Sequence, residues 1–452
     1  MPKTKIIATY GPSLDDERNL LAVLKYADII RLNFSHGNIE EKAEVIKRIR
    51  KLSAHLDKDI AILADLPGPK IRVSKLDNPI EIKNGDTVSF NYIDRASGND
   101  VPMDIDICKE VKKGSEIYIG DGEPKLLVTA ASGGKIICKA LQDGKIGSRK
   151  GINVKGSSLS AVPPTNDDVK FAKFAVEQNL DFIAMSFVKS AEDLAKMRSI
   201  VDGISIISKI ERQEAIDNIE SIANASDAIM IARGDMALNI DFRKVPIVQD
   251  KIIEVCRNAK KPVIVATQML STMAKNQMPT RAEMTDVANA VKSGVDCVML
   301  SDETAVGSYP AETVQAMSSI LSYTEDEMPH NFIMQKHASS GHEGIAVAAA
   351  SISYTCNMRC IFVPTHSGAT VKMLSSLRPE SAIVALSASD KMRRSLALYY
   401  GIIGAKAQKN DSDGAPEVKE YAKKLGVKSY MLVYGHKVAG NTSDAIRCFW
   451  GE

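Results

Sequence analysis

Eight short runs of mostly apolar residues recur along the sequence, and most of them are followed by a stretch with helical periodicity. The runs are Lys5–Thr9, Asp28–Asn33, Ile60–Asp65, Phe182–Phe187, Ser205–Lys209, Ala228–Ala232, Pro262–Thr267 and Cys297–Ser301. Continuously apolar strands that alternate with amphipathic helices indicate parallel strands covered on their outer face. Eight such units predict an α/β fold built on a (β/α)8 TIM barrel. We expect two of its helices to begin after Ser13 and Ser190, because acidic residues follow both serines.

The alternation is interrupted once, between the third and the fourth run. Residues 70–151 are rich in Gly, Asp and Lys and contain short strand-like pieces separated by turn dipeptides such as Asn84-Gly85. This pattern predicts a small β-barrel lid domain inserted into a loop of the main barrel, which residues 1–69 and 152–330 would form. An insertion at the strand ends could close over the active face of the barrel.

A new alternation of helices and strands begins near residue 338. We expect helices at Gly344–Tyr354 and Gly368–Leu377, and strands at Cys360–Pro364 and Ala382–Ser387. Residues 338–452 are therefore predicted to form a separate C-terminal αβ domain, with Glu325–Gly341 as its linker. The turn before its second helix could bind an effector phosphate, or it could equally be a plain helix start.

Composition and charge narrow the classes of function. The 452 residues are 44% hydrophobic and 25% charged, which is typical of a globular protein with two or three domains. The net charge of +2 provides no overall field for nucleic acid or an anionic membrane, so we expect neither as a partner. The N-terminus has no signal-peptide core and no apolar window is long enough for a membrane span, which predicts a cytoplasmic protein. Seven scattered cysteines without a CxxC pair favour buried free thiols over a zinc site.

Polar side chains follow six of the predicted strands at their C-terminal ends, where barrels of this type place their chemistry. Glu211 and Asp235 follow neighbouring strands and could present two carboxylates to one Mg²⁺, leaving positions for water and a substrate. Lys209 lies two residues before Glu211, so both point to the same side of an extended strand. A cation there suits the negative charge of a transferred phosphoryl group. The alternative is that the two carboxylates pair with Arg212 or Arg233 as structural salt bridges.

Several long motifs resemble the pyruvate kinase family, in order and over nearly the whole chain. They are Arg31–Gly37, Ser208–Glu211, Ile231–Asp235, Ala266–Leu270, Pro279–Glu283 and Met299–Ala305. The predicted barrel, lid and C-terminal domain also match the architecture of that family. The resemblance implies a Mg²⁺-dependent phosphotransferase of glycolysis that moves the phosphoryl group of phosphoenolpyruvate to ADP, giving pyruvate and ATP. It also implies a homotetramer.

The resemblance implies roles for individual residues as well. Arg31 would hold the substrate phosphate, Lys209 would stabilise the phosphoryl group during transfer, and Thr267 would help to deliver the proton that turns enolpyruvate into pyruvate. Glu211 and Asp235 would hold Mg²⁺ together with phosphoenolpyruvate. The substrate carboxylate would bind to the backbone of Gly234 and Asp235. The positions that match the nucleotide site of the family are Asn33, His36, Arg72 and Lys150.

One departure from the family pattern concerns the monovalent cation. In many pyruvate kinases K⁺ is held at the positions that match Asn33, Ser35, Asp65 and Leu66, and a glutamate stands where this chain has Lys70. Family members with lysine there tend not to need K⁺, because the ammonium can supply the positive charge that the ion brings to the phosphate site. We therefore expect that K⁺ is not required. The alternative is that Lys70 points into solvent at the hinge of the lid.

Two other functions use the same residues. The carboxylates and Lys209 could support Mg²⁺-assisted carbon–carbon lyase chemistry on a pyruvate-like enolate, because a barrel alone does not select a reaction. That hypothesis leaves the lid and the nucleotide positions unexplained. A phosphometabolite sensor without catalytic activity would require damaged catalytic residues, and all of them are present in this chain.

Overall fold

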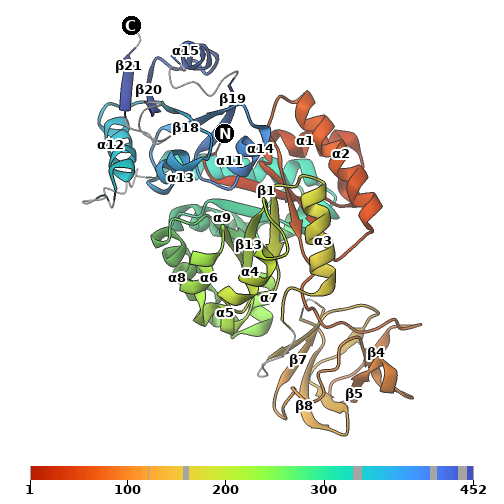
Figure 1. The fold of residues 1–452 in the computed structure, drawn as a ribbon. Helices are drawn as coiled ribbons and strands as arrows, with labels where there is room; N and C mark the ends of the chain where they lie inside the picture. The colour runs from red at the N-terminus through yellow and green to blue at the C-terminus, as the bar shows by residue number, and fades with distance from the viewer. Residues whose placement is uncertain are drawn as a thin grey trace.

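The computed structural model describes residues 2–120, 122–155, 162–328, 338, 340–407, 415–435 and 445–450. Its centre is a closed barrel of eight parallel strands (Figure 1). Seven of the strands lie within the predicted runs, and β13 extends one residue beyond its run. In chain order the strands are β1 (Lys5–Thr9), β2 (Ile29–Asn33), β3 (Ala61–Asp65), β12 (Phe182–Met185), β13 (Ser205–Ile210), β14 (Ala228–Ala232), β15 (Val263–Ala266) and β16 (Cys297–Leu300). The last strand pairs with the first, from Lys5 opposite Cys297 to Ala8 opposite Leu300. The predicted (β/α)8 barrel is confirmed.

The barrel interior follows the two-residue period of its strands. Ile7 packs inside the barrel, whereas its neighbours Ile6 and Ala8 pack against the surrounding helices. One residue of the interior cluster, Leu398, comes from the C-terminal domain. Its carbonyl lies 3.3 Å from the thiol of Cys297 at the start of β16, so the C-terminal domain closes the barrel at the N-terminal ends of its strands. The active site is therefore expected at the opposite end of the barrel, at the C-terminal ends of the strands.

Helices cover the outside of the barrel. They are α1 (Glu17–Tyr26), α2 (Ile39–His55), α3 (Asn166–Glu177), α4 (Ala191–Arg198), α5 (Gln213–Asp217), α6 (Ile219–Ala225), α7 (Arg233–Asn239), α8 (Val245–Asn258), α9 (Arg281–Ser293), α10 (Asp302–Ala305) and α11 (Pro310–Glu327). Ser190 precedes α4 and forms a capping box with Asp193, as predicted. The prediction for Ser13 is wrong, because Asp16 caps α1 and Ser13 lies in a 3-10 turn, where its hydroxyl bonds to the carbonyl of Gly307.

The inserted segment is an all-β lid domain. Its strands are β4 (Ile80–Ile82), β5 (Thr87–Tyr92), β6 (Val101–Met103), β7 (Glu116–Ile119), β8 (Lys125–Ser132), β9 (Lys135–Ala140), β10 (Gly144–Ile146) and β11 (Ile152–Lys155). Six of them form one sheet with β11 and β6 at its edges, and β4 pairs with β10. Bridges from Arg72 to Gly151 and from Val73 to Met103 join the two edges, which gives the lid its barrel-like form. β11 lies just beyond residue 151 and is still part of the lid sheet.

The C-terminal domain has a five-stranded sheet with the order β19-β18-β17-β20-β21. Its elements are α12 (Gly341–Thr355), β17 (Cys360–Pro364), α13 (Ala369–Ser376), β18 (Ala382–Ser387), α14 (Asp390–Ser395), β19 (Ile402–Lys406), α15 (Ala415–Lys424), β20 (Ser429–Tyr434) and β21 (Ala445–Trp450). The predicted linker begins inside α11, and residues 329–337 and 339 of it lie outside the described residues. Figure 1 shows the lid and this domain on opposite sides of the barrel.

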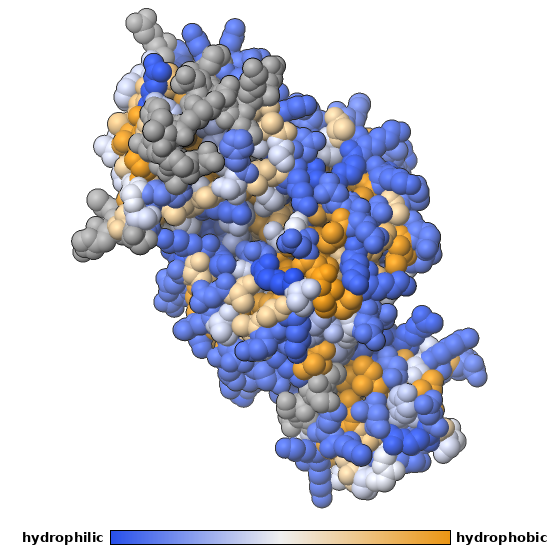
Figure 2. Space-filling view, in the orientation of Figure 1, coloured by the Kyte–Doolittle hydropathy of each residue, from blue (hydrophilic) through white to orange (hydrophobic). Residues whose placement is uncertain are grey.

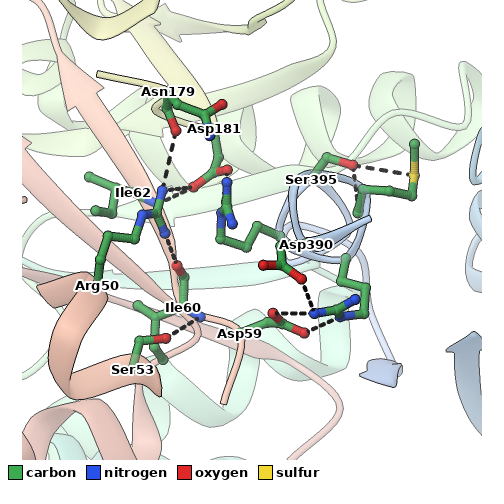
Figure 3. Close-up of polar contacts among 12 residues, drawn as sticks. Arg50, Ser53, Asp59, Ile60, Ile62, Asn179, Asp181, Asp390 and Ser395 are labelled. Atoms are coloured by element: carbon green, nitrogen blue, oxygen red, sulfur yellow. Dashed lines mark hydrogen bonds and ion pairs between the residues drawn. The ribbon is translucent and has the colours of Figure 1, made fainter. Parts of the chain in front are cut away.

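Buried ion pairs connect the C-terminal domain to the barrel (Figure 3). Asp181, just before β12, is fully buried and accepts from Arg50 of α2 at 2.9 Å and from Arg394 of α14 at 2.8 Å. Asp59, just before β3, pairs with Arg393 of α14 at 2.6 Å. Two consecutive arginines of α14 therefore hold the base of the barrel.

The surface and the helices give two further observations. Hydrophilic residues cover most of the face shown in Figure 2, and the hydrophobic patches on it are separate from one another. Among the described residues, no helix combines the length and the apolar character that crossing a membrane requires.

Of the seven cysteines, five are buried, Cys448 is half-buried and Cys356 is exposed, so the prediction of buried thiols is wrong for Cys356.

Candidate active site

A buried carboxylate, Asp65 at the end of β3, connects two of the predicted phosphate-binding cations. Arg31 of β2 donates to it from Nε at 2.8 Å and lies 2.6 Å away through a second nitrogen, while Lys209 of β13 lies 3.2 Å from its other oxygen. Burial alone would raise the pKa of Asp65, but the charges of Lys209 and Arg31 outweigh burial and hold it below its ordinary value. The carboxylate is therefore ionised, and it fixes both cations at the catalytic end of the barrel.

The Lys209 ammonium lies at the centre of the site. Besides Asp65, it contacts Glu211 at 3.0 Å and donates to the hydroxyl of Ser186 at 2.8 Å. Burial lowers the pKa of Lys209, but the nearby charges of Asp65, Glu211 and Asp235 outweigh burial and raise it above its ordinary value. The ammonium is thus a permanent positive charge that neighbouring groups hold in place.

Glu211 follows β13 and is completely buried. One of its oxygens, Oε2, accepts from the backbone N–H of Phe187 at 2.7 Å, whereas Oε1 receives no hydrogen bond and has only the ion pair with Lys209. Burial raises the pKa of Glu211, Lys209 opposes this rise, and the charge of Asp235 adds to it. A buried carboxylate with an unsatisfied oxygen is costly unless a further cation or donor occupies the site.

Asp235, in the first turn of α7, pairs with Lys70 at 3.0 Å. Burial alone would raise the pKa of Asp235, but the charges of Lys70 and Lys209 hold it below its ordinary value. Arg233 pairs with Asp286 at 2.9 Å instead, and the guanidinium of Arg212 stacks 4.8 Å from the ring of Phe187. The carboxylates therefore do not form the structural salt bridges with Arg212 and Arg233 that the alternative predicted.

Two glycines guide the Lys70 side chain to Asp235. Gly68 has a φ of +64°, and a Cβ there would lie 2.8 Å from the Cβ of Ser186, so only glycine fits this turn out of β3. At the return from the lid, a Cβ on Gly151 would lie 2.8 Å from Cε of Lys70. The lysine stem therefore passes between the lid return and the barrel. Its ammonium reaches the site and does not simply extend into solvent.

The end of β15 has a strained backbone. Thr267 and Gln268 have φ values of +70° and +55°, a region that β-branched residues such as threonine rarely adopt. The carbonyl of Thr267 accepts from Arg233, and its hydroxyl accepts from the backbone N–H of Gly234 at 2.8 Å. These contacts fix the Thr267 hydroxyl beside the Gly234-Asp235 segment, next to the carboxylate cluster.

The residues present fit a divalent cation of the magnesium type. Glu211 and Asp235 are close enough for their charges to interact, and Oε1 of Glu211 is buried without a hydrogen bond. No group of three or more His, Cys, Asp or Glu side chains suited to a metal occurs in the described residues. A cation held by two carboxylates would keep most of its positions for water and substrate oxygens, which is the usual arrangement for Mg²⁺ in phosphoryl-transfer sites.

Of the four positions matched to the monovalent cation, Asp65 is already paired with Arg31 and Lys209. The side-chain oxygen of Asn33 accepts from the backbone N–H of Ser35 at 3.0 Å, and the carbonyl of Leu66 accepts from the hydroxyl of Ser186 at 2.7 Å. The oxygens of Asn33 and Leu66 therefore have hydrogen-bond partners, whereas Oδ1 of Asp65 has only the ion pair with Lys209.

The four predicted nucleotide residues are brought together only in part. Asn33 and His36 line a cavity of about 1250 Å³ that also includes Arg31 and extends between α1 and α2. Burial lowers the pKa of His36, and the positive charge of Arg72 lowers it further. Lys150 does not line this cavity. It is exposed at the return from the lid, where its side chain lies against Gly120.

Three residues that sequence reasoning did not assign complete the site. Ser186 accepts from Lys209, Thr9 accepts from Arg31 at 3.1 Å, and the N–H of Phe187 donates to Glu211. Ser186 and Thr9 are polar residues in or next to apolar strands, and this departure from the apolar pattern could have identified them from the sequence. The contact of Phe187 could not be identified in this way, because it uses the backbone N–H.

Comparisons with known proteins agree with this geometry. The family model "Pyruvate kinase, barrel domain" matches residues 1–314, and "Pyruvate kinase, alpha/beta domain" matches residues 343–442. Pyruvate kinases of Clostridium perfringens and Agrobacterium vitis are each 39% identical to the chain. The first alignment covers 94% of the chain and 93% of the relative, and the second covers 90% and 86%.

A solved structure gives the same result. The crystal structure of a pyruvate kinase from Cryptosporidium parvum superimposes with a TM-score of 0.92 at 32% identity, over 100% of this chain and 96% of that one. Both family models are those of pyruvate kinase, which favours the kinase hypothesis over the lyase and sensor hypotheses. The chain belongs to the pyruvate kinase family, whose members are phosphotransferases that act on phosphoenolpyruvate and ADP.

Proposed function

We propose that this chain transfers the phosphoryl group of phosphoenolpyruvate to ADP with Mg²⁺ bound to Glu211 and Asp235, and that it does so without K⁺. The observation that carries the proposal is the buried Lys209 ammonium, held between Asp65 and Glu211 with Asp235 nearby. A positioned cation of this kind stabilises charge that develops on a phosphoryl group at no cost of reorganisation.

Arg31 and Lys209 bind and orient the phosphoryl group, because Asp65 holds both of them in fixed positions. Mg²⁺ supplies further positive charge to the phosphoryl oxygens when it is bound. The backbone of Gly234 and Asp235 binds the substrate carboxylate. The Gly234 N–H donates to the hydroxyl of Thr267, so the substrate would take over that donor.

Thr267 helps to deliver the proton to the enolate carbon. Its hydroxyl is fixed by Gly234, and its backbone is held in a strained conformation, which is a feature of residues with a functional role. Asn33, His36 and Arg72 bind the nucleotide around the cavity next to Arg31. Lys150 also binds the nucleotide, and because it lies on the lid, it reaches the phosphates only when the lid moves toward the barrel.

Lys70 replaces the monovalent cation. Its ammonium carries a single positive charge into the site beside Asp235, and Asp65 is already satisfied by two other cations. A further ion at Asn33, Ser35, Asp65 and Leu66 would add charge where the described side chains already supply it. By the family resemblance we also propose a homotetramer and a cytoplasmic location, and analytical ultracentrifugation would test the first of these.

A coupled assay of pyruvate formation tests the reaction. Purified protein is given phosphoenolpyruvate and ADP in tetramethylammonium buffer with Mg²⁺, with Mg²⁺ and K⁺, or with a chelator. We expect full activity in the first two conditions and none with the chelator. Activity that needs K⁺ would defeat only the Lys70 proposal, whereas no activity in any condition would defeat the kinase assignment.

A further inference from the structure

Two of the seven cysteines are not buried, and both belong to the C-terminal domain. Cys356 follows the last turn of α12 and is exposed, whereas Cys448 lies in β21 and is half-buried. The other five thiols are buried. Cys356 and Cys448 are therefore the two thiols that a small oxidant in solution reaches first.

The side chain of Cys448 lies on the face of the sheet that α12 covers. Phe449, the next residue, stacks on Tyr430 with 4.9 Å between the ring centres, on the face that packs against α15. Because side chains alternate along a strand, Cys448 lies on the opposite face. There it packs against the cluster that contains Met431, its partner across the sheet, and Ala350 of α12.

The C-terminal end of α12 lies against the last residues of β21. Ser429 donates from its hydroxyl to the carbonyl of Asn357, the residue after Cys356, at 3.4 Å. Ser429 pairs with Trp450 across the sheet, and Trp450 is two residues from Cys448, which corresponds to ~7 Å along a strand. Figure 1 likewise shows α12 beside β21. The fold therefore brings two cysteines from distant parts of the sequence to the same place.

The charges of the two thiols also interact. Burial raises the pKa of Cys448, and negative charge on Cys356 raises it further. Cys360 is closer to Cys356 in the sequence, but it packs in the cluster on the other face of the sheet. Burial alone raises the pKa of Cys360 to about 11, without a contribution from another cysteine. The interacting thiols are thus Cys356 and Cys448.

We propose that Cys356 and Cys448 form a site of reversible oxidation, at which hydrogen peroxide converts the two thiols into a disulfide. The Cys356 thiolate attacks a peroxide oxygen, the O–O bond breaks, hydroxide leaves, and the sulfur becomes a sulfenic acid. The Cys448 thiolate then attacks this sulfur, the S–O bond breaks, and a second hydroxide leaves as the S–S bond forms. The two protons lost by the thiols convert both hydroxides to water. One peroxide therefore takes up the two electrons that the pair of thiols loses.

The position of β21 suits such a bridge. A disulfide needs Cα atoms about 4.4–6.8 Å apart. Among the described strands β21 pairs only with β20, so it can move toward α12 without breaking a second row of hydrogen bonds. The bridge would close a loop that contains β17, β18, β19 and β20, which restricts the unfolded chain. Oxidation should therefore stabilise the C-terminal domain and leave the active site at the other end of the barrel unchanged.

The first test identifies the bridge in the full-length protein. The protein is treated with hydrogen peroxide, free thiols are blocked with iodoacetamide, and the tryptic peptides are analysed by mass spectrometry without reductant. Trypsin cleaves after Arg359 and Arg447, so the three cysteines of the C-terminal domain fall on separate peptides, 337–359, 360–372 and 448–452. We expect the first and the last of these to be linked, with two hydrogens fewer than the free peptides, and dithiothreitol should separate them.

The second test measures the effect on stability. Trp450, the only tryptophan of the chain, lies two residues from Cys448, and its fluorescence reports the thermal unfolding of this domain. Oxidation should raise the unfolding temperature of the wild type by about 5 °C or more. Cys356→Ser and Cys448→Ser should lose this shift and keep the kinase activity of the reduced protein. The matched control, Cys360→Ser, should keep both the shift and the linked peptides.

Three results would overturn the proposal. The first is that Cys356 and Cys448 are both recovered as iodoacetamide adducts after treatment with peroxide. The second is a link between two copies of peptide 337–359, because it would show a bridge between chains. The third is loss of the link in Cys360→Ser. Since Cys356 is exposed, Cys356→Ser should fold normally, so the test does not depend on the folding of Cys448→Ser.

Discussion

The ammonium of Lys70 lies 3.0 Å from a carboxylate oxygen of Asp235, although the two residues are 165 positions apart. Lys70 lies in the loop that leads from β3 to the lid, and Asp235 is in the first turn of α7. The contact therefore couples the hinge of the lid to a carboxylate of the proposed Mg²⁺ site. It also brings to the site the positive charge that we propose as the replacement for a monovalent ion.

Replacing Lys70 by Glu should create a requirement for K⁺. The substitution removes a cation and adds an anion beside Asp235, so a monovalent cation becomes favourable in the site. We expect low activity of Lys70→Glu in tetramethylammonium buffer and recovery when KCl is added, measured by pyruvate formation. The matched control is Lys75→Glu, an exposed lysine of the same segment, which should stay independent of K⁺. Equal activity of Lys70→Glu in both buffers would contradict the role of Lys70.

Replacing Lys209 by Met should keep the fold and lower phosphoryl transfer by a factor of ~10³ or more, because a positioned charge on a transferring phosphoryl group is worth that much. Enolisation of added pyruvate should fall less, since it does not require the transfer. Both rates can be measured on the same preparation, the second by exchange of the methyl protons of pyruvate in heavy water. Turnover of phosphoenolpyruvate near the wild-type rate would show that the assignment of Lys209 is wrong.

The barrel could be predicted from the sequence because each strand is locally encoded. Every β-strand of the barrel is an apolar run bounded by turn residues, and the structure places all eight within a residue or two of the predicted ends. The prediction for Ser13 failed because two residues compete for the cap of α1. Ser13 and Asp16 are both good caps, and the contact of Ser13 with Gly307, 294 residues away, cannot be read from local sequence.

The contacts of the site were less predictable, because they form only when the barrel closes. Ser186 reaches Lys209 since β12 and β13 are neighbours in register, with Met185 opposite Ser208. The choice of Asp235 as the partner of Lys70 depends on two glycines in different segments. Motif and spacing could select the charged residues, but could not decide which of them pair in the folded chain.

Removing either proposed metal ligand should weaken activation by Mg²⁺. Glu211→Gln and Asp235→Asn each replace a charged oxygen ligand by an amide, which attracts a hard cation less strongly. The Mg²⁺ concentration for half-maximal activity should rise in both variants, and excess metal should partly restore activity. Asp241→Asn, a half-buried carboxylate nearby in sequence that pairs with Arg243, serves as the control. An unchanged Mg²⁺ dependence in both variants would mean that these carboxylates do not bind the metal.

The His36 ring should titrate below the ordinary histidine pKa of 6.5, because burial and then the charges of Arg72, Lys42 and Arg31 disfavour its protonated form. As the pH falls from 7, this histidine should therefore stay neutral longer than a free one. NMR titration of the ring protons measures the midpoint directly. Arg72→Gln should raise the midpoint and Lys75→Gln should leave it unchanged. If the midpoint is the same in Arg72→Gln as in the wild type, Arg72 does not act on His36 and does not belong to the proposed nucleotide site.

Replacing Asp181 by Asn should destabilise the junction between the barrel and the C-terminal domain. The carboxylate is fully buried, pairs with Arg50 and Arg394, and accepts from the backbone N–H of Ile62 at 2.8 Å. An amide can keep the last contact, but it leaves two arginines without their counter-charge, and breaking a buried ion pair in this way costs about 3–5 kcal/mol. The matched control is Asp390→Asn in the neighbouring pair with Arg393, where the carboxylate is 67% exposed and its loss should cost less than about 1 kcal/mol. Urea unfolding followed by circular dichroism, with the fluorescence of Trp450 as a separate probe of the C-terminal domain, measures both. Similar small losses in the two variants would mean that the packing of Leu398 in the barrel, rather than the Asp181 ion pairs, holds the domains together.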